Sequence, residues 1–184
     1  MIDPRVERSR RVILQATLDE LGEHGYGGLT IEGVAARAAV GKATVYRHWR
    51  NKLELLEAAL QELRAEIVPD PQASPREQVA ELYRSLAAHL GDSQFSRCVP
   101  AVIEAAEHDE NVKAFKHRFI ADRRQYGVEL LCRAQAAGDI GPDIDVEVAV
   151  EAIAGAIFWR RLFTDRGMTT NEVDALLALV LRWE

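Results

Sequence analysis

The sequence of 184 residues is long enough for one large domain, or for a small domain joined to a larger one. Its apolar content of 48% and its net charge of −6 are ordinary for a globular protein, and no segment is apolar enough to span a membrane. The N-terminus lacks the apolar core of a secretory signal, and Cys98 and Cys132 do not form a CxxC pair. We therefore expect a cytoplasmic protein with free thiols.

Positive charge is concentrated at the N-terminal end of the chain. Residues 1–50 contain eight Lys or Arg and six Asp or Glu, a net charge of +2, which leaves −8 for the remainder. Phosphate groups attract the first part and repel the second. This division favours one segment that faces DNA and a larger body that is held away from it.

Capping signals and helical spacing predict the first elements in chain order. A first helix runs from about residue 4 or 5 to residue 24, with Gly25 as its C-terminal cap. Thr30 has the character of an N-cap for a second, short helix. A third helix is predicted over 42–49 after a tight turn, and Asn51 opens a fourth helix with a capping box.

A Pro-rich break, PDPQASP at residues 69–75, separates these helices from the rest of the chain. Beyond it, helices are predicted from about residue 75 and over 96–107, 109–137, 145–165 and 170–183. No segment alternates as a strand would, so the expected fold class is all-α, with an N-terminal three-helix helix-turn-helix domain joined to a larger helical bundle. We place the first domain at 1–50, a connecting helix at 51–68 and a helical effector-binding and dimerisation domain at 74–184.

Residues 29–56, LTIEGVAARAAVGKATVYRHWRNKLELL, have the pattern of a helix-turn-helix. Two helices cross closely in this motif, and Ala35 supplies a small side chain at the contact. The expected buried face consists of Val34, Val40, Val45 and Trp49. The other side chains of the predicted recognition helix are therefore available to the major groove.

The outward side of that helix carries groups suited to DNA. Lys and Arg supply salt-dependent attraction to phosphate, Thr44 and Tyr46 can donate to phosphate oxygens, and Ala43 can pack on a thymine methyl group. The candidate DNA-binding residues are Thr30, Lys42, Ala43, Thr44, Tyr46, Arg47, His48 and Lys52. The alternative is a merely solvated helix surface, which is the usual explanation of a lone Lys or Arg but not of the whole pattern.

At these positions the chain resembles the tetracycline-repressor (TetR) family of transcriptional regulators. The matching residues are Ile13-Leu14-Gln15-Ala16, Gly25-Tyr26, Thr30, Val34-Ala35, Ala39 to Lys42, Thr44 to Trp49 and Asn51-Lys52, within roughly the first third of the chain. The resemblance implies phosphate contacts for Thr30, Tyr46, His48 and Lys52, and places Lys42, Ala43, Thr44 and Arg47 against bases or the adjacent backbone. Two positions depart from a regular motif. Ala39 stands where the family's turn usually has Gly, and Gly33 costs its helix about 1 kcal/mol against Ala.

The segment 146–163 is apolar around nearly its whole circumference, so we expect it to be buried on two sides. One apolar side includes Val148, Ala152 and Trp159, with Gly155 between them. The predicted dimer interface, formed with the last helix, consists of Val146, Val150, Ile153, Ile157, Val173, Leu176, Leu177 and Val180. A four-helix homodimer of this kind is also what the family resemblance implies, and the alternative is a core helix of a monomer.

A polar interruption in the apolar stripe of the predicted helix 109–137 is a candidate ligand site. The candidate lining residues are Tyr83, Phe119, Asp122, Arg123, Tyr126, Phe158 and Trp159. The alternatives are a satisfied internal ion pair, or an Arg123 stem that lies along the stripe with its charged head in water.

Catalytic and metal-binding motifs are absent from the sequence, so we expect neither an enzyme nor a cofactor. The leading hypothesis is a homodimeric transcriptional regulator that binds a palindromic operator on double-stranded DNA and is released, as a repressor, by an unknown small-molecule effector. The second is a DNA-binding dimer without an effector. The third is a helical ligand-binding protein or enzyme.

Overall fold

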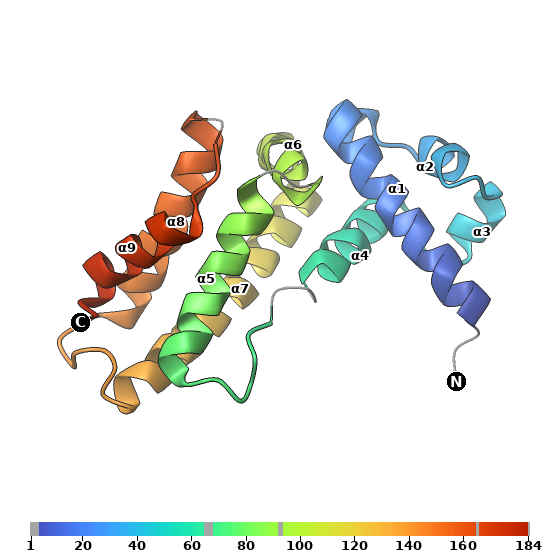
Figure 1. Ribbon diagram of the computed structural model, residues 1–184. Helices are drawn as coiled ribbons and strands as arrows, with labels where there is room; N and C mark the ends of the chain where they lie inside the picture. Colours follow the sequence, from blue (N-terminus) through green and yellow to red (C-terminus); the bar gives the residue numbers. More distant parts are fainter. Residues whose placement is uncertain (1–3, 65–67, 92–93, 165, 184) are drawn as a thin grey trace. The chain divides into compact units, whose positions relative to one another are not determined.

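The computed structural model describes residues 4–64, 68–91, 94–164 and 166–183. These residues form nine α-helices and no strand, which confirms the all-α prediction (Figure 1). The chain divides into two compact units, an N-terminal unit of residues 1–66 and 97–116 and a C-terminal unit of residues 67–96 and 117–184. Residues 97–116, which the sequence placed in the second domain, thus belong with the N-terminal helices. No helix in the described ranges could cross a membrane.

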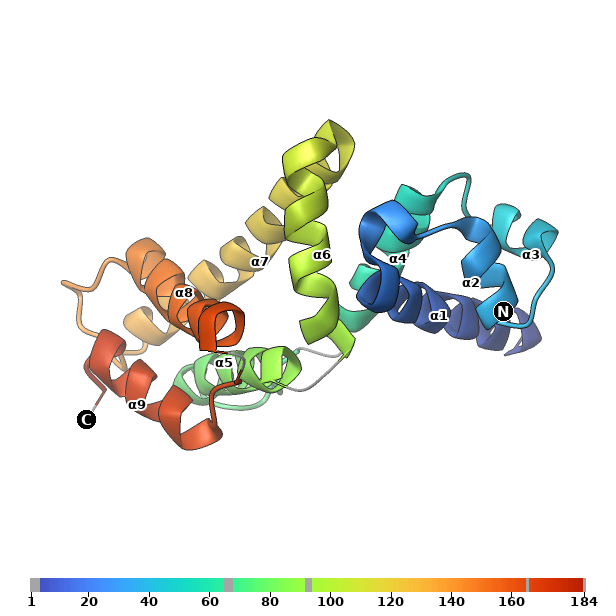
Figure 2. The same cartoon turned by 90° about the horizontal axis from the view of Figure 1, so that it is seen from above.

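The N-terminal unit is built on α1 (Pro4–Gly28), α2 (Ile31–Arg37), α3 (Lys42–Tyr46) and α4 (Lys52–Arg64). Helix α1 packs against α2 and α4, and α2 packs against α3 (Figures 1 and 2). The fully buried side chains of the N-terminal unit include Ile13, Leu14, Leu21, Leu29, Val34, Val45, Leu55 and Leu56. Helix α1 is therefore amphipathic, and its apolar side, with Ile13, Leu14 and Leu21, packs into the core.

Gly25 interrupts α1, but it does not end the helical segment as predicted. Its φ of 66° breaks the regular helix, and one further turn follows to Gly28. The N–H of Leu29 donates to the carbonyl of Gly25 at 3.1 Å, which closes that turn. A left-handed backbone favours glycine, so the predicted breaking residue is right and the predicted end is a turn too early.

Residues 97–116 join the N-terminal unit through the second part of α6 (Gln94–His108) and the start of α7 (Glu110–Ala136). The thiol of Cys98 is fully buried and lies 3.4 Å from the carbonyl oxygen of Leu18 on α1. Burial raises the pKa of Cys98 to about 12, so this thiol stays protonated and serves as a small packing group; it is free, as predicted. Cys132, by contrast, is exposed.

The C-terminal unit contains α5 (Pro75–Gly91), most of α7, α8 (Val146–Thr164) and α9 (Thr170–Leu181). Helices α5, α8 and α9 pack against one another (Figure 2). Two of its helices have side-chain caps at their N-termini. Ser74 accepts from the N–H of Glu77 at 3.2 Å, and Thr169 forms the full capping box with Glu172. The last helix ends two residues before the predicted Trp183, because Arg182 adopts a left-handed conformation with φ 53°.

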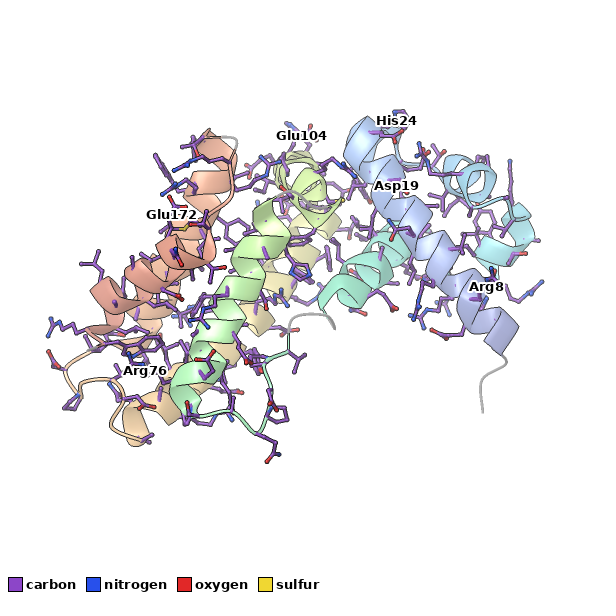
Figure 3. All side chains as sticks on the ribbon, in the orientation of Figure 1. Arg8, Asp19, His24, Arg76, Glu104 and Glu172 are labelled. Carbon is purple, nitrogen blue, oxygen red and sulfur yellow. The ribbon has the colours of Figure 1, made fainter. Side chains whose placement is uncertain are left out.

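Glu172 connects several parts of this unit at the start of α9 (Figure 3). One carboxylate oxygen accepts from Arg160 of α8 at 2.9 Å, and the other accepts from the backbone N–H of Thr169 at the same distance. The hydrogen bond from Thr169, followed by that from Arg160, lowers the pKa of Glu172 to about 2. The carboxylate of Glu172 is therefore charged at neutral pH and keeps its bonds to Arg160 and Thr169.

Pro100 lies in the second turn of α6, because this helix begins at Gln94, earlier than the predicted start near residue 96. A proline has no N–H, so the carbonyl of Ser96 four residues earlier has no helical donor. Arg161 of α8 supplies one, with its Nη2 donating to that carbonyl at 3.2 Å. The guanidinium also donates to the Ser96 hydroxyl, which itself donates to the carbonyl of Leu90 at 3.0 Å.

The turn between α2 and α3 is a Schellman motif with Ala39 at its left-handed position. The N–H of Val40 donates to the carbonyl of Ala35 at 3.0 Å, and the N–H of Ala39 donates to the carbonyl of Ala36 at 3.1 Å. These two hydrogen bonds define that motif. Ala39 has φ 52°, so the strain predicted from its side chain is present.

We expect Ala39→Gly to raise the free energy of unfolding by about 0.5–1 kcal/mol, because glycine adopts this backbone without steric cost. Urea denaturation followed by circular dichroism measures the change. Ala38→Gly is the matched control, since Ala38 has an ordinary helical φ of −75° and should lose stability instead. Equal losses in both variants would contradict the strain.

Candidate DNA-binding surface

The recognition helix is shorter than predicted. Helix α3 ends at Tyr46, and residues 47–48 form a turn, where the sequence predicted helix through Trp49. The N–H groups of His48 and Trp49 both bond the carbonyl of Val45 at 3.0 Å, which tightens the helix end. The chain must turn there because α4 begins at Lys52.

The start of α4 has a variant of the predicted capping box. The side chain of Asn51 accepts from the N–H of Glu54 at 2.9 Å. The carboxylate of Glu54 accepts from the N–H of Arg50 at 2.8 Å, and not from that of Asn51 as in the standard box. Both bonds fix the chain direction directly after α3.

The structure brings most candidate DNA-binding residues to one accessible surface around α3. Val45 and Trp49 are buried behind it, as predicted. The exposed candidates are Thr30, Lys42, Ala43, Tyr46, Arg47 and His48, and Thr44 is half-buried. Tyr46 has half of its area exposed although it is aromatic, which leaves its hydroxyl accessible to a phosphate. We refer to these residues as the α3 surface.

Two candidates already have protein partners. Lys42 Nζ lies 3.0 Å from Glu32, an exposed pair that DNA can displace at little cost. The hydrogen bond from Lys42 lowers the pKa of Glu32. Lys52 is held more firmly, since its Nζ donates to the carbonyl of Tyr26 at 2.8 Å and lies 4.2 Å from the centre of that ring. Lys52 therefore ties the start of α4 to the end of α1, a role that the sequence did not suggest.

The candidate ligand-binding residues do not share one environment. Tyr83 is 2% exposed, whereas Asp122 is exposed and Trp159 is 57% exposed. Phe119, Arg123, Tyr126 and Phe158 are half-buried, and the Arg123 guanidinium lies 5.8 Å from the centre of the Phe119 ring. Because α8 presents Trp159 to its surface, this residue cannot line an internal cavity of the protomer.

The hydroxyl of Tyr83 is buried without a hydrogen-bond partner among the residues that the structure describes. It lies against Gly127 of α7, where an added β-carbon would be 3.3 Å from both this hydroxyl and Val150. Burial raises the pKa of Tyr83, so the group is a neutral phenol that can donate a hydrogen bond. An unpaired polar group at such a depth is costly and requires an explanation.

The candidate dimer residues lie mainly inside the protomer. Val150, Ile153, Ile157, Val173 and Leu177 are buried, and Val146, Leu176 and Val180 are half-buried. The opposite side of α8 is exposed and consists of Val148, Ala152, Gly155, Trp159 and Phe163, which we name the α8 stripe. Trp159 and Phe163 stack with ring centres 6.1 Å apart, and Leu179 of α9 is 77% exposed. An apolar stripe of this length is unusual on a monomer.

Known families and structures match the chain over almost its whole length. Residues 13–59 match bacterial regulatory proteins of the tetR family, and residues 68–180 match the tetracyclin repressor-like C-terminal domain. The uncharacterised HTH-type transcriptional regulator YdeS of Bacillus subtilis is 30% identical over 95% of this chain and 88% of its own. The DNA-binding transcriptional repressor TetR of Mycobacteroides abscessus is 30% identical over 97% of this chain and 96% of its own.

Solved structures show the same fold. A putative TetR-family regulator from Rhodococcus sp. aligns with a TM-score of 0.77 at 22% identity over 95% of this chain and 99% of that one. A TetR-family regulator from Pseudomonas syringae aligns with a TM-score of 0.67 at 30% identity over 95% of each chain. The helix-turn-helix, the helical C-terminal unit and these relatives lead to one conclusion: the chain belongs to the TetR family and is a DNA-binding transcriptional regulator.

Proposed function

We propose that this regulator is a cytoplasmic repressor that binds a palindromic operator as a homodimer, and that it acts by regulation and not by catalysis. The α3 surface carries the proposal, because it leaves basic and hydroxyl side chains exposed while Val45 and Trp49 fix the helix from behind. The Mycobacteroides abscessus relative, a DNA-binding repressor, supports the direction of regulation.

The residues of the α3 surface divide into two groups by chemistry. Thr30, Tyr46 and His48 donate to phosphate oxygens and set the position of the helix on the duplex. Lys42, Ala43, Thr44 and Arg47 face base edges or the adjacent backbone. Lys52 contributes to phosphate binding from the start of α4, while it holds Tyr26.

The homodimer forms through the α8 stripe, with Leu179 of α9 beside it. Large side chains at Val148, Trp159 and Phe163 flank the small residues Ala152 and Gly155, which lets two copies of α8 approach closely. A two-fold axis through this contact covers the exposed apolar surface and presents two α3 helices to two half-sites. The buried residues that the sequence proposed support the stripe from within the protomer.

A small-molecule effector that releases the repressor is supported by the unpaired hydroxyl of Tyr83. A mainly apolar ligand with one acceptor oxygen would satisfy this donor at the centre of the C-terminal unit. A DNA-binding dimer without an effector is the second candidate. In that case the Tyr83 hydroxyl binds no ligand, and Tyr83 serves only in the packing of the C-terminal unit.

Electrophoretic mobility shift with the DNA upstream of the protein's own coding region tests the proposed function. We expect a retarded complex at moderate salt that unlabelled upstream DNA displaces and unrelated DNA of equal length does not. A complex that both competitors displace equally would contradict sequence-specific regulation.

Tyr83→Phe should leave the free energy of unfolding unchanged or raise it by about 1 kcal/mol, because it removes an unpaired buried hydroxyl. Thermal unfolding measures this change. Tyr46→Phe, on exposed Tyr46 of the N-terminal unit, is the control for the loss of a phenol hydroxyl away from this site. Compounds from a screened library that stabilise the wild type should lose that effect in Tyr83→Phe alone, and equal stabilisation of both variants would contradict the effector contact.

A further inference from the structure

A buried carboxylate joins α1 to the C-terminal end of α2, close to the turn that leads into α3. Glu20 of α1 is 8% exposed, and its Oε1 accepts from Arg37 Nε at 2.7 Å. Arg37 Nη1 also donates to Glu23 at 3.0 Å, but Glu23 is exposed. His24, at the end of the same helix (Figure 3), lies 4.0 Å from Glu20. Arg37 thus makes one shielded hydrogen bond, to Glu20, and two solvent-exposed hydrogen bonds, to the two carboxylate oxygens of Glu23.

Gly33 is the second component of this arrangement. A β-carbon at position 33 would lie 2.7 Å from Glu20 Oε2 and 3.2 Å from the hydroxyl oxygen of Thr30, the N-cap of α2. The first distance is shorter than real contacts allow. A carboxylate at the end of a flexible side chain could normally yield, but Arg37 holds this one in a largely buried position. Glycine at position 33 therefore makes room for Glu20.

From these contacts we propose that Glu20, Gly33 and Arg37 form a clamp that sets the orientation of α2 and, through the turn at Ala39, of the recognition helix α3. The clamp residues are positioning residues and do not touch DNA. A buried carboxylate requires its partner, so Arg37 cannot move away from Glu20 without leaving an unpaired charge. The clamp thereby allows one placement of α2 on α1. The inference rests on the proposed role of the α3 surface.

The clamp also explains an irregularity of the motif. Alanine favours a helix over glycine by about 1 kcal/mol, so Gly33 weakens the short helix α2 on its own. The position imposes a requirement that alanine cannot meet. That requirement is contact between the α2 backbone and the buried carboxylate, which only a residue without a β-carbon permits.

The test compares affinity for two DNA duplexes by fluorescence anisotropy. One is the duplex that the wild-type protein selects from a random library, and the other is an unrelated duplex of equal length. Glu20→Gln should weaken binding to the selected duplex by about tenfold, similar to the loss of one base-pair contact, and should change binding to the unrelated duplex by less than about twofold. Glu23→Gln is the matched control, because it changes the exposed contact of the same Arg37 and should have little effect on either duplex.

A double-mutant cycle isolates the role of Gly33. Gly33→Ala should weaken binding to the selected duplex by about tenfold in the wild type. In a Glu20→Ala background the same change should cause no further loss, since no carboxylate then opposes the new methyl group. Gly33→Ala alone, measured on both duplexes, decides the matter even if the variants at Glu20 do not fold.

Two results would overturn the clamp. One is wild-type affinity of Gly33→Ala for the selected duplex. The other is a proportional loss on both duplexes, which reports fewer folded molecules and not a displaced α3. Failure of the wild type to select any duplex would instead contradict the proposed DNA-binding surface, so the two failures are distinguishable.

Discussion

Gly155→Glu should convert the regulator from a dimer to a monomer at micromolar concentration. Gly155 is central in the α8 stripe, and a two-fold axis would bring two introduced carboxylates into an apolar contact. Burial of these like charges should raise the dimer dissociation constant by roughly a hundredfold or more. Sedimentation velocity measures the change in mass.

The protomer itself should tolerate this substitution, because a β-carbon at position 155 meets nothing within 4 Å. Ala121→Glu, at an exposed alanine of α7, is the matched control and should remain a dimer. Operator affinity should fall by about a hundredfold or more when dimerisation is lost, since two linked half-site contacts become independent. A Gly155→Glu protein that sediments as a dimer would show that the α8 stripe is not the interface.

Arg47→Ala should lower operator affinity by about 1–3 kcal/mol and also relax the base preference at one position of each half-site. Arg47 caps α3 and is exposed, so its guanidinium is free of packing constraints and can pair with a guanine edge. Binding to a panel of duplexes with single base changes measures both effects.

Two variants separate base contact from charge in this experiment. Arg50→Ala removes the same charge from exposed Arg50 and should weaken all duplexes slightly and uniformly. Tyr46→Phe should also act uniformly, because a hydroxyl that donates to phosphate carries no sequence information. If Arg47→Ala left the order of preference among the duplexes unchanged, Arg47 would be a phosphate contact.

Much of the fold follows from local sequence. The Thr30 cap of α2 depends on neighbouring residues, and the structure has it as predicted. The capping box at Thr169 and the buried side of α1 are local features of the same kind. Other features depend on distant partners. Because Pro100 cannot donate to the carbonyl of Ser96 within α6, this carbonyl accepts a hydrogen bond from Arg161, 65 residues away. No local sequence pattern predicts that pairing.

The DNA-binding surface was more predictable than the dimer surface, for a physical reason. On α3 Val45 is a large aliphatic side chain among small and polar ones, so it identifies the buried side, and the residues around it are exposed or half-buried. On α8 both sides are apolar, and hydrophobicity alone does not tell which side packs within the protomer. The sequence therefore identified both faces of α8 and assigned the inner one, with Ile153, to the dimer.

The clamp shows the limit of motif analysis most clearly. The sequence shows that Gly33 is unfavourable in a helix. The reason for a glycine at this position, in the proposed clamp, is the carboxylate of Glu20, 13 residues earlier on another helix. Similarly, Lys52 fits the family's phosphate contact, whereas its bond to Tyr26 became visible only with the packing of α4 against α1. Such contacts require the relative placement of helices within a unit.

Selection of duplexes from a random library by the protein, followed by sequencing, tests whether this regulator reads DNA as a two-fold symmetric dimer. We expect enrichment of one palindromic sequence whose half-sites are centred about one helical turn, 10–10.5 base pairs, or a multiple of this apart. Arg47→Ala should enrich the same palindrome with one degenerate position in each half. A library that stays random, or an enriched site without two-fold symmetry, would contradict a homodimer that binds DNA through the α3 surface.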